Sequence, residues 1–100
     1  VVQPVTVKLA PQNWRHANTN AVVVAKTGAG ILRRAVINTK GATSNVLTIY
    51  DGTTTGGALI ASIDTVNAVG GMFDYELPFT TGLTFQLAGG TAADITIIFE

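Results

Sequence analysis

Short apolar runs separated by turns of glycine, threonine and asparagine recur along this chain. The clearest case has two apolar runs, 46–50 (VLTIY) and 58–63 (ALIASI), on either side of the insert 51–57 (DGTTTGG). Glycine adopts backbone angles with positive φ, and aspartate can hydrogen-bond its own backbone, so the insert is typical of a hairpin loop. The repeating unit of the fold is therefore predicted to be strand, glycine–threonine loop, strand.

Alternating apolar and polar positions predict more strands on both sides of this hairpin. The expected strands are 5–9, 21–26, 30–39, 72–77, 83–87 and 95–99, with Pro78 ending the fourth of them and the polar stretch 11–20 serving as a connection. Seven to eight short strands bounded by glycine turns indicate an all-β antiparallel β-sandwich, jelly-roll-like or immunoglobulin-like. We expect a single domain, with an N-terminal strand or arm and its connection in 1–20 and the sandwich in 21–100.

The alternation also predicts which side chains form the core. On each strand the apolar residues of one parity should face the opposite sheet, because successive side chains point to opposite faces. The expected core residues are Leu47, Ile49, Leu83, Phe85, Leu87, Ile95, Ile97 and Phe99.

The strand 30–39 differs in having apolar side chains of both parities. Strict alternation places Ile31, Ala35 and Ile37 on one face and Leu32 and Val36 on the other. The neighbouring Arg33 and Arg34 must then point to opposite sides, and one of them should reach a sheet edge or a carboxylate. A sheet that exposes a second apolar row invites a partner, so this strand is a candidate interface.

Composition excludes several classes of function. Hydrophobic residues make up 47% of the chain and charged residues only 12%, with six basic and six acidic side chains and zero net charge. Such a chain has no basic patch for nucleic acid. Its longest apolar run, 21–25, is far too short to span a membrane. There is no cysteine, and therefore no disulfide or thiolate chemistry.

Catalytic groups are sparse. His16 is the only histidine and has no acidic residue near it in sequence, so a nucleophile–base–acid triad is not expected. Asp74 and Glu76 share one face of a strand, and Asp51 and Asp64 flank the hairpin loop. Paired carboxylates could serve glycoside hydrolysis or calcium binding. We expect them instead to lie at the surface and to pair with Arg33, Arg34 or Lys40, and we expect no enzymatic activity, cofactor or metal.

Two motifs carry a resemblance to a known family. A strand ending in Tyr50-Asp51-Gly52 leads into a threonine–glycine loop, and the segment 78–83 (PFTTGL) precedes the last two strands. Over residues 30–100 the chain resembles short all-β proteins of tailed-bacteriophage particles, which include capsid decoration (cement) proteins. The resemblance implies a non-enzymatic protein on the capsid exterior that binds the major capsid protein and stabilises the head. It also implies a homo-oligomer, a trimer being favoured by threefold lattice sites.

A second class of function stays open, namely a carbohydrate-binding or host-adhesion module of a phage tail or fibre. Its sugars would stack on exposed rings, for which the candidates are Trp14, Tyr50 and Tyr75. The apolar N-terminal segment could add as an edge strand to another subunit or pair within its own sheet. The candidate interface residues are Val2, Val5, Val7, Trp14, Leu32, Arg34 and Val36.

Overall fold

The structure is a computed structural model that describes residues 12–68 and 71–100. All regular structure in these ranges is β-strand, and the predicted antiparallel β-sandwich is confirmed. The strands are β1 (Asn13–Ala17), β2 (Val22–Thr27), β3 (Gly30–Thr39), β4 (Val46–Asp51), β5 (Ala58–Asp64), β6 (Met72–Phe79), β7 (Gly82–Ala88) and β8 (Asp94–Phe99). The predicted strand 5–9 lies outside the described residues.

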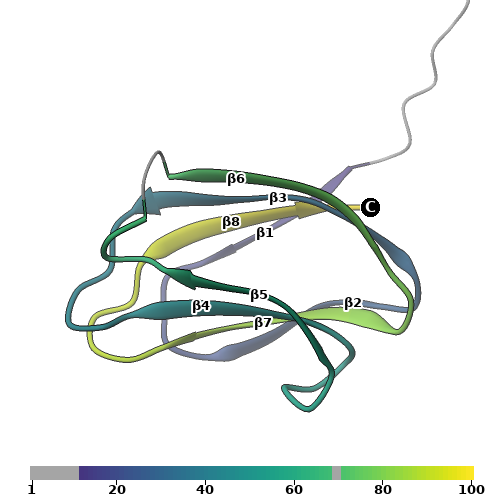
Figure 1. Ribbon diagram of the computed structural model, residues 1–100, viewed down its shortest axis with the longest axis horizontal. Coiled ribbons are helices and arrows are strands. Elements are labelled where there is room, and N and C mark those ends of the chain that lie inside the picture. Colours follow the sequence, from purple (N-terminus) through teal and green to yellow (C-terminus); the bar gives the residue numbers. More distant parts are fainter. Residues whose placement is uncertain (1–11, 69–70) are drawn as a thin grey trace, which may run out of the picture.

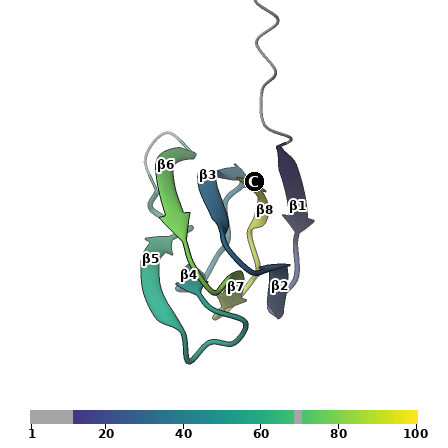
Figure 2. The same ribbon diagram turned by 90° about the vertical axis from the view of Figure 1, so that its right-hand side faces the viewer.

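The strands form two four-stranded sheets that pack face to face (Figure 1). One, called here the β1 sheet, has the order β1-β8-β3-β6, and the other, the β2 sheet, has the order β2-β7-β4-β5. Seen from the end of the sandwich, β1 and β2 lie on one side and β5 and β6 on the other (Figure 2). Only the β4–β5 hairpin stays within one sheet, so every other connection crosses between the layers.

The eight strands of the described residues are arranged as nested antiparallel pairs around the predicted hairpin. β4 pairs with β5, β3 with β6, β2 with β7 and β1 with β8. The glycine–threonine loop is therefore the tip of one long hairpin that rolls up into two sheets. This order is that of an eight-stranded jelly roll, the first of the two predicted topologies.

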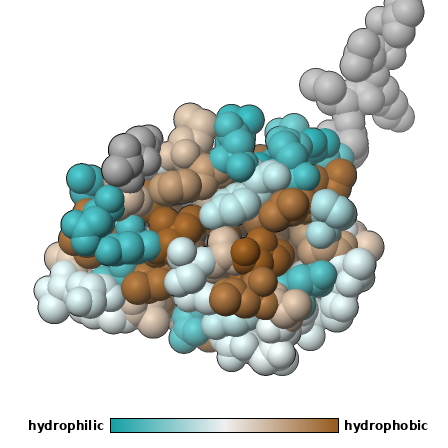
Figure 3. All heavy atoms as spheres, viewed as in Figure 1, coloured by the Kyte–Doolittle hydropathy of each residue, from teal (hydrophilic) through white to brown (hydrophobic). Residues whose placement is uncertain are grey.

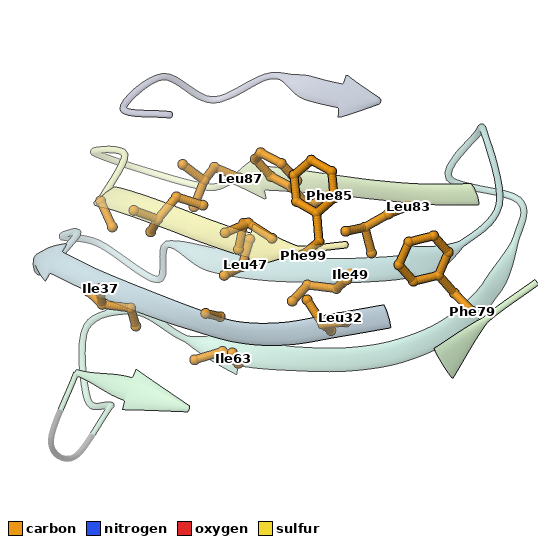
Figure 4. Close-up of a cluster of buried hydrophobic side chains, with 14 residues drawn as sticks. Leu32, Ile37, Leu47, Ile49, Ile63, Phe79, Leu83, Phe85, Leu87 and Phe99 are labelled. Atoms are coloured by element: carbon orange, nitrogen blue, oxygen red, sulfur yellow. The ribbon is translucent and has the colours of Figure 1, made fainter. Parts of the chain in front are cut away.

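The core lies between the sheets and contains every residue predicted for it. Leu47, Ile49, Leu83, Phe85, Ile95 and Ile97 have no exposed surface, and Leu87 and Phe99 have almost none. Figure 4 shows these side chains meeting Leu32, Ile37, Ile63 and Phe79 from strands of both layers. The alternation of β7 and β8 thus places one apolar row of each strand in the interior.

A β-bulge in β3 overturns the predicted face of Leu32. Leu32 pairs with Phe99 while Arg34 already pairs with Ile98, so Arg33 is an extra residue in β3. A bulge of this kind shifts the alternation by one position. Leu32 therefore faces the core with Ala35 and Ile37 and is fully buried, and the prediction that it belongs to an exposed interface is wrong.

Strand β1 was not predicted. The stretch 11–20, expected to be a connection, contains β1, which pairs along its whole length with β8. Four of its five residues are exposed and only Ala17 is half-buried, so no apolar alternation marks it in the sequence. β6 also continues through Pro78 to Phe79, because it is an edge strand in which a missing N–H costs no sheet hydrogen bond.

A buried asparagine ties four loops together at one end of the sandwich. The Asn45 side chain is fully buried, and its amide Nδ2 donates to Asn20 Oδ1 at 2.9 Å and to the Gly89 carbonyl at 2.7 Å. Its Oδ1 accepts from the Thr65 hydroxyl at 2.8 Å and from the Ala93 N–H at 3.1 Å. One side chain therefore links the loops that precede β2, β4, β6 and β8.

Asp51 ties two loops together at the opposite end of β4. Its carboxylate accepts hydrogen bonds from the backbone N–H groups of Thr80, at 3.0 Å, and Thr81, at 2.9 Å. These hydrogen bonds hold the pKa of Asp51 below its usual value, and the bond from the Thr80 N–H has the largest effect. The Gly52 N–H also donates to the Gly82 carbonyl at 3.0 Å. The two motifs that carry the family resemblance thus form one hydrogen-bonded unit.

Candidate interaction surface

The outer face of the β1 sheet combines exposed apolar side chains with a small polar cluster. We call it the Trp14 face. It consists of the outward residues of β1, β8, β3 and β6, namely Trp14, His16, Asp94, Thr96, Ile98, Arg34, Val36, Asn38, Met72 and Asp74.

Two cross-strand rows organise this face. In the first, Ile98 on β8 lies directly opposite Trp14 on one side and Arg34 on the other. In the second, Thr96 lies between His16 and Val36, and Val36 in turn lies opposite Met72. Side chains directly opposite each other in an antiparallel sheet stand about 5 Å apart at Cβ. The apolar residues of the two rows are therefore neighbours on one surface.

Trp14 and Met72 dominate the exposed apolar area of the face. Trp14 is 70% exposed and Met72 is 53% exposed, while Val36 and Ile98 are half-buried. An edge strand gives Trp14 a neighbour on one side only, which leaves its ring open to solvent. A large aromatic ring this exposed is typical of a binding surface rather than of a packing anchor.

Arg34 lies in the middle of the face and is paired. Its Nε lies 3.3 Å from Asp74 Oδ1, and its Nη1 donates to the Met72 sulfur at 3.8 Å. Both charged groups are well exposed, so this ion pair contributes little to the stability of the fold. The pair leaves the centre of the face close to electrically neutral while keeping a guanidinium available to a partner.

The polar part of the face is a hydrogen-bonded cluster around Asp94. His16 Nε2 lies 2.8 Å from Asp94 Oδ1, and Asn38 Nδ2 donates to the same oxygen at 2.9 Å and to the Thr96 hydroxyl at 3.0 Å. Asn38, and secondly His16, lower the pKa of Asp94. Sequence separation concealed this His–Asp contact, since the two residues are 78 positions apart.

This contact does not amount to a catalytic triad. A triad needs a hydroxyl or thiol hydrogen-bonded to the histidine as nucleophile. Among residues 12–68 and 71–100, the only side chain hydrogen-bonded to His16 is that of Asp94. The cluster instead fastens the edge strand β1 to β8 and β3.

The remaining carboxylates have structural partners. Asp74 and Glu76 pair with Arg34 and Arg33 as predicted, and the bulged Arg33 also contacts Glu100. Asp51 and Asp64 were expected to pair with a basic side chain. They instead accept hydrogen bonds from the backbone N–H groups of turns. The part of the chain that the structure describes holds no group of three or more His, Asp or Glu side chains placed to bind a metal ion.

The structure brings together three of the seven predicted interface residues. Trp14, Arg34 and Val36 share the Trp14 face, where Trp14 and Arg34 flank Ile98. Leu32 is in the core, and Val2, Val5 and Val7 lie outside the described residues. Sequence reasoning missed Ile98 and Met72. Ile98 could have been found, because it is apolar at the outward position between the core residues Ile97 and Phe99.

The three candidate sugar-stacking rings lie on three different surfaces. Tyr50 is half-buried on the outer face of the β2 sheet, opposite Leu59, which is 62% exposed. Tyr75, on β6, packs against the core from the side where β5 and β6 lie. Trp14 is thus the only one of the three that stands free on an open face.

No protein-family model matches the chain, and no curated protein matches it. The described residues include no helix long and apolar enough to cross a membrane.

Proposed function

We propose that this chain is a non-enzymatic structural protein of a tailed-phage virion, and specifically a capsid decoration protein. In this proposal it sits on the capsid exterior, binds the major capsid protein and stabilises the head. The observation that carries the proposal is the exposed ring of Trp14 on the same sheet face as Ile98, Val36 and Arg34.

The composition of the Trp14 face supports a protein partner. Tryptophan, methionine and arginine are the residue types enriched at the centres of protein interfaces, and this face has one of each within two cross-strand rows. The single charge in its centre is already balanced by Asp74. Low net charge lets many copies pack side by side without repulsion.

A second candidate is the carbohydrate-binding or host-adhesion module. Jelly rolls occur in lectin domains as well as in viral capsids, so the fold suits both functions. Trp14 is the observation that favours this alternative, because an exposed indole can stack against a sugar ring. The separation of Tyr50 and Tyr75 from Trp14 weighs against it, since one sugar chain on the face of Trp14 would not reach either of the other two candidate rings.

Binding assays on two surfaces separate the candidates. The purified protein is incubated with empty capsids assembled from the major capsid protein of the same virus, and separately with a glycan array. The decoration proposal predicts saturable co-sedimentation with capsids and no glycan signal. Glycan binding without capsid binding would instead select the adhesion module.

A further inference from the structure

The side of the sandwich formed by β5 and β6 is open. β5 ends the β2 sheet and β6 ends the β1 sheet, and no strand of the described residues pairs with the free edge of either. Figure 3 looks onto this side and shows hydrophobic side chains gathered across its middle. A hollow of about 310 Å³ lies there, lined by Ile63, Ala68, Phe73 and Tyr75, with Ser62, Asp64 and Asn67 also contributing.

Two polar side chains of the hollow, Asp64 and Asn67, are turned toward their own loop. Asp64 Oδ1 accepts from the Val66 N–H at 2.9 Å, and Asp64 Oδ2 accepts from Asn67 Nδ2 at 2.8 Å. The two rings, Phe73 and Tyr75, are half-buried and pack against the core. What the hollow offers an occupant is therefore apolar contact, which suits aliphatic side chains better than a sugar or an ion.

The two free edges on this side, those of β5 and β6, differ in how well they are protected. β6 contains Asp74, Glu76 and Pro78, and Glu76 has a φ of 51°, which interrupts the regular strand. β5 has a bulge at Ile60, but the residues after it are regular, contain no proline and carry a charge only at Asp64, the last residue. An unprotected edge is a template for another strand. The stretch 61–64 of β5 is thus ready to accept one.

We propose that residues 5–9 of a second copy of this chain pair with the free edge of β5 and fill the hollow between β5 and β6. In an extended segment Val5, Val7 and Leu9 share one side, which would face Phe73 and Tyr75. Thr6 and Lys8 point to the other side, toward solvent, and Lys8 is the only charged side chain in residues 1–11. Main-chain hydrogen bonds to β5 supply affinity and the hollow supplies specificity.

The short segment between Leu9 and β1 indicates that the paired strand comes from a second copy and not from the same chain. β1 begins at Asn13, on the edge of the β1 sheet opposite β6, three strand spacings away. Three spacings are about 14 Å across the sheet, and Phe73 of the hollow is level with Arg15, two residues along β1 from Asn13, so the straight line through the protein is about 16 Å. The four steps from Leu9 to Asn13 span at most about 14 Å fully extended, and the path around the surface is longer. Leu9 therefore cannot enter the hollow of its own chain.

Paramagnetic labelling between molecules tests the placement. The chain contains no cysteine, so Lys8→Cys offers a single site for a spin label. Spin-labelled chains without nitrogen-15 are mixed with untagged nitrogen-15 chains. Broadening of the amide signals of residues 61–64 and 73–75, growing with concentration, is the expected result. The proposal would be overturned if these signals did not broaden at millimolar concentration, or if the signals of other strands broadened instead. A control sample holds chains that carry both the spin label and nitrogen-15, diluted in unlabelled protein. Broadening seen only in this control would mean that the contact lies within one chain, which would also overturn the proposal.

A pair of variants tests which side of the segment is buried. Val7→Asp should weaken self-association at least about tenfold in sedimentation equilibrium. The matched control, Thr6→Asp, adds the same charge on the solvent side and should leave association nearly unchanged. Equal weakening by both variants, or by neither, contradicts the assignment. No capsid is present in these measurements, so their failure is separate from failure of the decoration proposal.

Discussion

Asn45 is a fully buried polar side chain that four loops share. Asn45→Ala would leave the buried Ala93 N–H without its acceptor, whereas the Thr65 hydroxyl would keep its second acceptor, the Asn45 backbone carbonyl. Because an unsatisfied buried group costs about 1–3 kcal/mol and the other side-chain hydrogen bonds of Asn45 are lost as well, we expect the unfolding free energy to fall by about 2–3 kcal/mol. Urea unfolding gives the value. Asn20→Ala, which removes an exposed partner of the same amide, should cost about 1 kcal/mol, and an equal cost for both would refute the shared role.

Asp51 makes stability depend on acid pH. The pKa values of Asp51, Asp64 and Asp94 are all lowered by hydrogen bonds in the folded protein. The unfolded chain therefore binds more protons in acid, and stability falls as pH falls. The contribution is complete well above the ordinary aspartate pKa of about 3.9 and is lost as pH drops through the lower folded values.

Urea unfolding at pH 7 and pH 3 measures this loss. In Asp51→Asn the difference in unfolding free energy between the two pH values should shrink. The control is Asp74→Asn, a carboxylate that caps no turn, in which the acid-induced loss should persist. An Asp51→Asn variant that retains the full difference would show that the turn bonds to Thr80 and Thr81 do not carry it.

At the scale of elements, β7 contributes three buried side chains to the core, Leu83, Phe85 and Leu87. Phe85 is fully buried between the sheets, so Phe85→Ala should reduce the unfolding free energy by about 3–5 kcal/mol, a large fraction of the stability of a domain this size. Leu59→Ala, on β5 and 62% exposed, should change it by no more than about 0.5 kcal/mol. Urea unfolding of the two variants gives the comparison, and similar costs would mean that the core is not where the structure places it.

Alternation predicted those strands whose two faces differ in environment. β3 has the predicted bounds, and β7 and β8 show their core rows, because each has one face against the opposite sheet. β1 could not be found in this way, since both of its faces are largely exposed and it is held by pairing with β8 alone. The bulge at Arg33 was also hidden, because it depends on register with β8 and not on local residue type.

At the scale of the whole molecule, strand order decides which residues meet. The sequence indicated the central hairpin and the class of fold, but nothing local shows that β8 lies between β1 and β3. That placement puts Trp14 and Arg34 on either side of Ile98 and His16 against Asp94. The candidate surface is therefore a product of the jelly-roll order, and of the interface residues predicted from the sequence only Trp14, Arg34 and Val36 lie on it.

The contact between the Trp14 face and the capsid lattice can be measured by titrating empty capsids with matched variants. Trp14→Ser removes the exposed ring on the β1 sheet, and Leu59→Ser removes a comparably exposed side chain on the outer face of the β2 sheet. If Trp14 is a central contact, its loss should raise the dissociation constant by about thirtyfold, while the Leu59 variant should stay within about twofold of the unchanged protein. Capsid binding that is insensitive to Trp14→Ser, or equally weakened by Leu59→Ser, would contradict the assignment of this face.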